Sequence, residues 1–396
     1  MKKQRRATAK ASAQGGRMTD LRAGARETKT LAPYARPRPC PLSFRSPALG
    51  ARLSPSPAVI PLRPPGRPAI LLWIPANTET GGMGRFTEEE IKRKVHEGYI
   101  LESPDEMTEG YRKALIVQLL VQADTELMSA PAYWMAAQDA PSTNTQVSAV
   151  AIIQDELAHA NIAYRILEDM GLDKDQLVYG REPHEFKHPY GFDQPLESWA
   201  ELVTANGFFD RAGITLLSDV YRNTSYGPLK RALVKVDLEE TFHLRHGEVW
   251  MKRLANAGGE AREKLQRAVD WMFPMTIEWF GLPDTLKRHS GQLEYRLKGM
   301  TNDELRQTWM SATVPLCESL RIDVPAHYDE TRKEYILDYP FPCQYDPTDK
   351  RWDFASGEIT WDTVFERWKA RGPMNERYVE AVRTSHGALE KLLKAA

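Results

Sequence analysis

Cysteine is scarce in this sequence, and an apolar export segment, a glycine-rich phosphate-binding loop and a nucleic-acid-binding motif are all missing. Only three of the 396 residues are cysteine, which excludes a disulfide framework, and their spacing excludes a CxxC metal site. No hydrophobic run is long enough to span a membrane. We therefore expect a cytoplasmic protein that binds neither membranes nor nucleic acid.

Basic residues and prolines are concentrated near the N-terminus, whereas acidic residues dominate the rest. Residues 1–80 contain 15 Lys and Arg against 3 acids, together with 12 of the 27 prolines, and the remaining residues contain 38 basic against 51 acidic side chains. Such a segment buries too little apolar surface to offset the entropy lost on ordering it. We expect residues 1–82 to form a disordered basic tail, or to precede a true start at Met83.

Apolar residues recur at helical spacing from residue 85 onward, and prolines and glycines divide them into long segments. Four long helices are predicted, at residues 107–140, 142–171, 196–225 and 229–257. At 1.5 Å per residue each would be roughly 40–50 Å long, as is typical of bundle helices. The connection between the second and third helices is longer than the turns within each pair. The prediction is an all-α four-helix bundle of two hairpins joined by a crossover.

The C-terminal part of the chain is predicted to extend this bundle. We expect the bundle domain to occupy residues 83–324 and an elaboration packed on it to occupy residues 325–396. Extra helices are predicted at 260–280, 301–320 and 374–393. The Tyr, Trp and Pro content of residues 325–361 indicates short strands or irregular segments.

Two Glu-x-x-His pairs lie in the middle of the second and fourth predicted helices. They are Glu156 with His159 and Glu240 with His243. A spacing of three residues places both side chains of a pair on one face of a helix. Each pair therefore offers one carboxylate and one imidazole to the same side of its helix.

A lone acid stands among apolar residues in each of the other two helices. Glu126 precedes Glu156 by 30 residues, and Asp210 precedes Glu240 by 30 residues. The two hairpins therefore share one layout. Because antiparallel helices joined by a short turn bring such positions level, each hairpin should deliver a lone carboxylate and a Glu-x-x-His pair to the same height in the core.

This layout predicts a two-metal site. Four carboxylates and two imidazoles from four helices are the ligand set of ferritin-like di-iron and di-manganese proteins. Such hard donors favour iron, or manganese, over zinc or copper. We also expect Asp155 and Glu239, which precede the motif glutamates, to accept the free N–H of the opposite hairpin's histidine. The predicted metal ligands are Glu126, Glu156, His159, Asp210, Glu240 and His243.

The alternative interpretation is that these side chains form buried ion pairs or solvated helix faces, as single acids and histidines on helices usually do. The repeated 30-residue spacing of six residues favours the metal site over this alternative. A third Glu-x-x-His at residues 185–188 lies between two prolines, where a helix is disfavoured, and we do not expect it to contribute. His246, three residues after His243, either supports the metal ligands from outside the cluster or is an ordinary surface histidine, and we favour the surface histidine.

Several motifs resemble a known family, the catalytic A subunits of phenylacetyl-CoA epoxidase, within the phenylacetic acid catabolic proteins. The resemblance begins near Tyr111 and continues into the C-terminal region. It rests on the segments YRK at 111–113, QDELAH at 154–159, TSYGP at 224–228, EETFH at 239–243 and TNDELRQ at 301–307.

The resemblance implies that the six ligands hold two irons that activate O₂ for insertion into an aromatic acyl-CoA as an epoxide. It also implies a structural partner subunit of similar bundle fold, a flavin/iron-sulfur reductase that uses NADPH, and a small accessory subunit. The sequence carries no flavin or nicotinamide motif of its own, which agrees with electrons arriving from another protein.

The sequence departs from this family at the positions that the resemblance assigns to the acyl-CoA. Polar or basic residues are expected there, but this chain has Val117, Val121 and Ile152. The resemblance therefore supports the metal ligands more strongly than it supports the substrate. The substrate could be another thioester or a molecule without CoA.

Two other classes of protein remain open from the sequence. A ferritin-like iron-storage or ferroxidase protein could use the same ligands, but such chains are usually about half as long and lack the C-terminal elaboration. A metal-free structural subunit of an oxygenase complex would have no reason to keep all six ligand positions filled.

Overall fold

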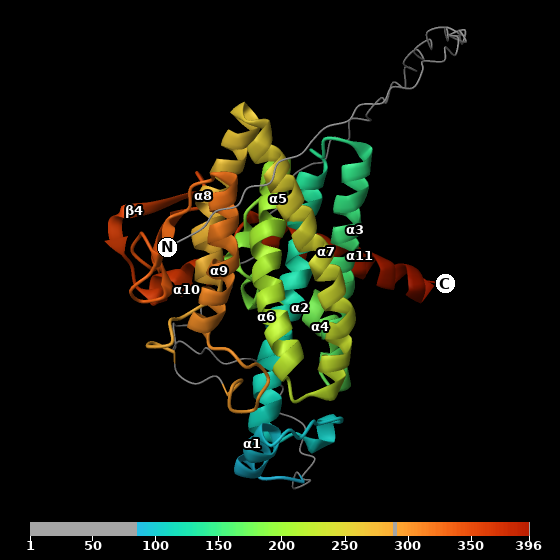
Figure 1. The fold of residues 1–396 in the computed structure, drawn as a ribbon. Helices are drawn as coiled ribbons and strands as arrows, with labels where there is room; N and C mark the ends of the chain where they lie inside the picture. Colours follow the sequence, from blue (N-terminus) through green and yellow to red (C-terminus); the bar gives the residue numbers. More distant parts are fainter. Residues whose placement is uncertain (1–84, 288–290, 396) are drawn as a thin grey trace, which may run out of the picture. The chain divides into compact units, whose positions relative to one another are not determined.

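The structure is a computed structural model that describes residues 85–287 and 291–395, so the tail predicted at 1–82 lies outside the described residues. The fold is all-α, as predicted, with a bundle of long helices and two small sheets (Figure 1). Within the described ranges, no helix is long and apolar enough to cross a membrane.

The bundle consists of the two predicted hairpins, and its helices lie within a few residues of the predicted bounds. The first hairpin is α2 (Glu109–Ala137) and α3 (Thr143–Asp169), and the second pairs an interrupted helix with α7 (Gly227–Ala257). The hydroxyl of Ser142 caps α3 by accepting from the Thr145 amide, which satisfies one of the N–H groups left free at a helix start. α2 packs against α3, α5 and α11, which explains why most of its side chains are buried.

The third long helix is present at residues 199–223, close to the predicted 196–225, but it contains a π-helical turn that was not predicted. It consists of α5 (Trp199–Ala205), a π-helical turn (Asn206–Asp210) and α6 (Arg211–Asn223). Gly247 of α7 lies against this turn, where an added Cβ would be 2.4 Å from the Gly207 nitrogen. A π turn widens the helix locally, and such turns frequently occur at functional sites.

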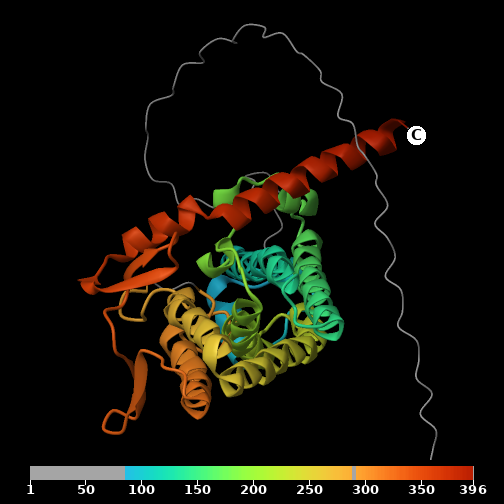
Figure 2. The same cartoon turned by 90° about the horizontal axis from the view of Figure 1, so that it is seen from above.

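The remaining elements surround the bundle. α11 crosses α2 and α4 (Figure 2). Strands β1 and β2 pair antiparallel, as do β3 and β4, in the region predicted to hold short strands. The sequence analysis did not predict α1, α4 or α10. The bounds are α1 Glu88–His96, α4 Lys174–Tyr179, α8 Gly259–Trp279, α9 Asn302–Leu320, β1 Ala326–Asp329, β2 Glu334–Leu337, β3 Cys343–Asp346, β4 Arg351–Glu358, α10 Trp361–Ala370 and α11 Pro373–Ala395.

Buried charged groups attach the C-terminal segment to the crossover between the hairpins. Arg371 binds Asp193 at 3.2 Å and donates to the His188 carbonyl at 3.1 Å. His188 is itself buried and bonds Asp193 at 2.5 Å. The third Glu-x-x-His, at residues 185–188, therefore serves this junction and not the bundle interior, in agreement with the sequence analysis.

Candidate metal centre

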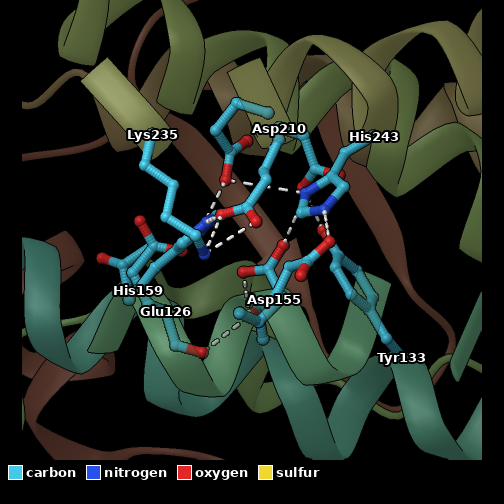
Figure 3. A network of polar contacts seen from close by, with 12 residues as sticks. Glu126, Tyr133, Asp155, His159, Asp210, Lys235 and His243 are labelled. Atoms are coloured by element: carbon cyan, nitrogen blue, oxygen red, sulfur yellow. Dashed lines mark hydrogen bonds and ion pairs between the residues drawn. The ribbon is translucent and has the colours of Figure 1, made fainter. Parts of the chain in front are cut away.

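Four helical segments bring the predicted ligands into one buried cluster (Figure 3). α2 contributes Glu126, the π-helical turn ends in Asp210, and α3 and α7 each contribute a Glu-x-x-His pair. Each of the six residues is at most 6% exposed. Acids and histidines are rarely buried this deeply without a partner. The cluster comprises Glu126, Glu156, His159, Asp210, Glu240 and His243.

Glu240 lies between the two histidines and joins five of the six residues into two overlapping groups, Glu126 with His159 and Glu240, and Glu156 with Glu240 and His243. Asp210 belongs to neither group and lines the small space that the other three carboxylates also line. Its Oε1 is 3.2 Å from His159 Nδ1 and 3.6 Å from His243 Nδ1. His159 Nδ1 also lies 3.6 Å from Glu126 Oε2, and His243 Nδ1 lies 3.2 Å from Glu156 Oε1. In each group of three residues the candidate ligand atoms lie within 4.8 Å of one another. Glu240 belongs to both groups, as a carboxylate that bridges two metal ions would.

The outer nitrogen of each histidine faces a carboxylate from the opposite hairpin. His159 Nε2 lies 3.0 Å from Glu239 Oε2, and His243 Nε2 lies 3.4 Å from Asp155 Oδ2. Lys235 in turn binds Glu239 at 2.7 Å. The predicted crossing of histidines and acids between the hairpins is confirmed. With Nε2 facing the outer carboxylate, each Nδ1 faces into the cluster, which is the ring orientation that metal ligation through Nδ1 requires.

The inward-facing atoms fit bound metal ions. Among the described residues, His159 Nδ1, His243 Nδ1 and Glu156 Oε1 are buried yet make no hydrogen bond of acceptable geometry. Buried polar atoms normally have a partner, and these three converge on one space. Four carboxylates and two imidazoles match the ligand preferences of iron and manganese.

The protonation of the metal-free cluster differs strongly from that of free side chains. Burial and neighbouring carboxylates raise the pKa of Glu126 and of Asp210 well above their usual values. Burial opposes the charged form of the histidines, but adjacent carboxylates raise the pKa of His159 to about 11 and that of His243 to about 12. Burial alone would raise the pKa of Glu240, yet the two imidazoles that lie against its carboxylate lower it to about 2.

A second set of polar residues fixes the orientation of Asp210. The Tyr133 hydroxyl donates to Asp210 Oδ1, and the Asn206 amide donates to Oδ2 at 2.8 Å. His246 Nδ1 lies 3.0 Å from the Asn206 oxygen. The prediction that His246 is an ordinary surface histidine is therefore wrong, because α7 turns it toward the π-helical turn.

The sequence analysis missed three residues that touch the cluster. Tyr133 and Asn206 contact Asp210, and the Ser129 hydroxyl donates to Glu156 Oε2 at 2.6 Å. A usable signal existed for Asn206, since it stands four residues before Asp210 and thus one turn away. Tyr133 and Ser129 gave no such signal, because each acts on a residue of another helix.

A cavity of about 190 Å³ opens beside the cluster. Most of the surface of its wall is apolar, although seven of its fifteen lining residues are polar or charged, Lys298 and Asn302 among them. A smaller space of about 30 Å³ touches the clustered carboxylates and shares with the larger cavity Thr125, Glu126, Gly213, Leu217 and Trp279. These shared residues lie where the cavity adjoins the space at the cluster.

The three positions assigned to acyl-CoA by resemblance differ in their surroundings. Val121 lines the larger cavity, whereas Val117 and Ile152 are not among its lining residues. Ile152 is 1% exposed and packs in the core. Of the three substitutions, the one at Val121 thus bears directly on what the cavity can admit.

Replacement of Glu239 by alanine should weaken metal binding about 10- to 100-fold, the usual effect of removing a partner that orients a ligand histidine. The cause would be loss of the acceptor that holds the His159 ring. Titration of the metal-free protein with Mn²⁺, followed by calorimetry, would measure it. Glu239→Gln keeps an acceptor oxygen and should restore part of the affinity, whereas equal losses in both variants would contradict the orienting role.

Comparison with known proteins gives three matches. The profile of the family described as "Phenylacetic acid catabolic protein" matches residues 84–349, which include all six clustered residues. The A subunit of the 1,2-phenylacetyl-CoA epoxidase of Escherichia coli (strain K12) is 29% identical over 302 residues, covering 75% of this chain and 91% of that relative. The C subunit of the same enzyme is 27% identical over 109 residues, covering 27% of this chain and 43% of that relative.

Proposed function

The chain belongs to the phenylacetic acid catabolic protein family, and we propose that it is the catalytic subunit of a multicomponent di-iron epoxidase that acts on an aromatic acyl-CoA. The buried cluster of four carboxylates and two histidines beside an apolar cavity carries this proposal. The similarity to the A subunit of the 1,2-phenylacetyl-CoA epoxidase supports the reaction and the substrate class.

The six clustered residues would hold the two metal ions. Two irons bound there would supply the electrons and open coordination positions that reaction with O₂ requires. Glu240 would help to hold both ions, since its Oε1 lies near both imidazoles. Glu239 and Asp155 would keep the imidazole rings in place, and Asn206 would hold Asp210.

The cavity fits the aromatic part of such a substrate. An apolar cavity of about 150 Å³ can hold benzene, and this one measures about 190 Å³. Phe280, Leu216 and Val220 contribute apolar surface to its wall. The nucleotide part of a CoA thioester is far too large for this volume, so only the acyl group would enter.

The electrons for this reaction would come from another protein, because the sequence contains no flavin or nicotinamide motif. We propose a flavin/iron-sulfur reductase that uses NADPH, a structural bundle subunit, and a small accessory subunit. Support comes from the similarity to two different subunits of one epoxidase.

Reductase-driven turnover of a thioester panel would test the proposal. Phenylacetyl-CoA, other aryl- and alkyl-CoA thioesters and free phenylacetate would be incubated with NADPH, the reductase and the partner subunits, and the products analysed by mass spectrometry. The proposal predicts a gain of one oxygen atom in at least one aromatic thioester. Steady oxidation of Fe(II) without reductase or thioester, with a growing mineral core, would instead show a ferroxidase. If the chain contained no iron but its addition made a different subunit active, its role would be structural.

Substitution of Gly213 by phenylalanine should fill the region where the cavity adjoins the space at the cluster. A Cβ at Gly213 meets nothing within 4 Å, so this position borders open space that a phenyl ring would fill. We expect kcat/KM to fall on the order of 100-fold, as for other substrates displaced from the reacting position, with metal content unchanged. Gly213→Ala is the matched control, and its turnover should stay near that of the parent. Full activity in Gly213→Phe would contradict access of the substrate through this region.

A further inference from the structure

The two lone carboxylates of the cluster, Asp210 and Glu126, are supported differently. Both oxygens of Asp210 accept hydrogen bonds from neutral side chains, since the Tyr133 hydroxyl donates to Oδ1 and the Asn206 amide donates to Oδ2 at 2.8 Å. The carboxylate of Glu126 instead faces His159 Nδ1 at 3.6 Å, and in the described part of the chain no hydroxyl or amide side chain donates to it. Asp210 is therefore the more firmly held of the two.

The hydrogen bonds around Asn206 run in one direction. A ligand carboxylate can only accept, so the amide NH₂ of Asn206 faces Asp210 and the amide oxygen faces the opposite way. His246 Nδ1 lies 3.0 Å from that oxygen and must carry the proton that it donates. Burial, together with the charges of His243 and Arg253, lowers the pKa of His246 to about 4, so the ring is neutral at pH 7 and has this one N–H. His246 therefore orients Asn206, which in turn holds Asp210.

The position of His246 on α7 directs its ring toward the π-helical turn. Three residues advance a helix by about 300°, which is roughly 60° short of a full turn, so His246 points to one side of the ligand His243. Gly247 allows α7 to lie close to the turn, because an added Cβ there would be 2.4 Å from a backbone nitrogen of the turn. The rings of Trp199 and Phe242 flank the imidazole, with centroids 5.6 Å and 6.4 Å from its own. These contacts fix the imidazole against Asn206.

The two lone carboxylates also belong to different sides of the cluster. Figure 3 shows Glu126 and His159 together on one side and His243 on the other. The imidazole whose charge acts on Asp210 is that of His243. Glu126 lines both the larger cavity and the small space at the cluster, whereas Asp210 lines the small space. A metal position beside Glu126 and His159 would therefore face the cavity, and one beside Asp210 and His243 would lie farther from it.

We propose that His246 is a positioning residue that fixes Asp210 through Asn206 and so makes the metal position beside Asp210 the tighter of the two. This inference rests on the proposed function, from which it takes the two bound metal ions. A ligand that is already held in place loses less conformational freedom when it binds, which raises the affinity. The position beside Glu126 lacks this support and would bind its ion more weakly, on the side where a substrate enters the cavity.

Titration of the metal-free, full-length chain with Mn²⁺, followed by calorimetry, tests this inference. The parent should bind two ions in two steps of different affinity. His246→Leu removes the donor and should weaken the tighter step roughly 10-fold, the lower end of the usual effect of removing a partner that orients a ligand, with the weaker step unchanged. His246→Asn places an amide N–H near the position of Nδ1 and should restore the tighter step. Glu239→Ala acts on His159 and should weaken the other step instead.

The proton on His246 can be located without any variant. Nitrogen-15 NMR of the chain loaded with Zn²⁺, a d¹⁰ ion that leaves the spectrum free of paramagnetic broadening, should show the His246 proton on Nδ1. A proton on Nε2 instead would overturn the inference, because the ring could then not donate to Asn206. This measurement decides the question if His246→Leu does not fold.

Several outcomes of the titration would overturn the inference. Equal weakening of both steps in His246→Leu would show a general loss of stability, and an unchanged tighter step would show that His246 does not act on Asp210. Failure of His246→Asn to restore the tighter step, or a parent that binds both ions with equal affinity, would also contradict it.

The inference and the proposed function can fail separately. A parent that makes epoxide while His246→Leu binds both ions as tightly as the parent refutes only the inference. A parent that shows the two steps and the predicted variant effects, but makes no epoxide, refutes only the proposed function. A parent that binds no metal refutes both.

Discussion

Replacement of Glu240 by alanine is expected to abolish binding of both metal ions and to reduce turnover below detection. Glu240 is the one carboxylate shared by both groups of candidate ligands found in the described part of the chain, with Oε1 at 3.2 Å and 3.6 Å from the two Nδ1 atoms. Its loss would therefore remove a ligand from both metal positions at once. Metal analysis after reconstitution with Fe(II), together with a turnover assay, would measure the loss.

The same substitution should destabilise the metal-free protein while leaving its helices formed. Glu240 pairs with both imidazoles, which its absence would leave partly uncompensated in the core. Breaking a buried pair typically costs about 3–5 kcal/mol, which thermal unfolding would detect. Glu248→Ala is the matched control on α7, because Glu248 binds Arg211 at a partly exposed site outside the cluster. Metal loss in Glu248→Ala, or full metal content in Glu240→Ala, would contradict the assignment.

Metal affinity is expected to rise steeply with pH. In the metal-free protein the pKa values of His159 and His243 are raised to about 11 and about 12. Both rings are therefore positively charged imidazolium ions, with a proton on each nitrogen, at neutral pH. Metal binding requires neutral imidazoles and therefore releases these protons. Burial also raises the pKa of Glu126 and Asp210, which adds to the release. The apparent Kd for Mn²⁺ should fall at least tenfold per pH unit between about pH 6 and 8.

Calorimetry in buffers of different ionisation enthalpy would count the released protons directly. His327→Gln, an exposed histidine on β1, should leave the slope unchanged. An apparent Kd that does not vary with pH would contradict the imidazolium pairs.

The stability of the metal-free fold depends on pH in a different way from metal affinity. Raised histidine pKa values contribute stability that is fully present below the unfolded value of 6.5 and is lost as the pH rises through about 11 to 12. The lowered pKa of Glu240 contributes stability that is present above 4.5 and is lost as the pH falls through about 2. Metal loading and fold stability should therefore respond to pH in different ranges.

The long helices and the clustering of the six side chains could be predicted because both depend on local spacing. A period near 3.6 residues marks a helix, and the shared 30-residue offset from Glu126 to Glu156 and from Asp210 to Glu240 marks a repeated hairpin. The crossing of Glu239 toward His159 followed from the antiparallel arrangement. Whether these residues hold iron stays a prediction.

The π-helical turn and the support of Asp210 could not be predicted because they depend on contacts between distant segments. The turn lies against Gly247 of α7, where a larger side chain would collide with backbone. Tyr133 reaches Asp210 from α2, 77 positions away in the sequence. Short helices such as α1 and α10 were missed because a few turns give too little periodicity to separate them from loops.

X-ray absorption of iron-reconstituted protein tests the central claim most directly. The account predicts two irons per chain, surrounded by oxygen and nitrogen neighbours only, with a second iron roughly 3.5–4 Å away, the usual separation in two-metal sites. The iron–iron signal should disappear in Glu240→Ala and persist in Glu248→Ala. A single iron, a zinc ion bound in preference to iron, or an iron–iron signal that survives in Glu240→Ala would contradict the account.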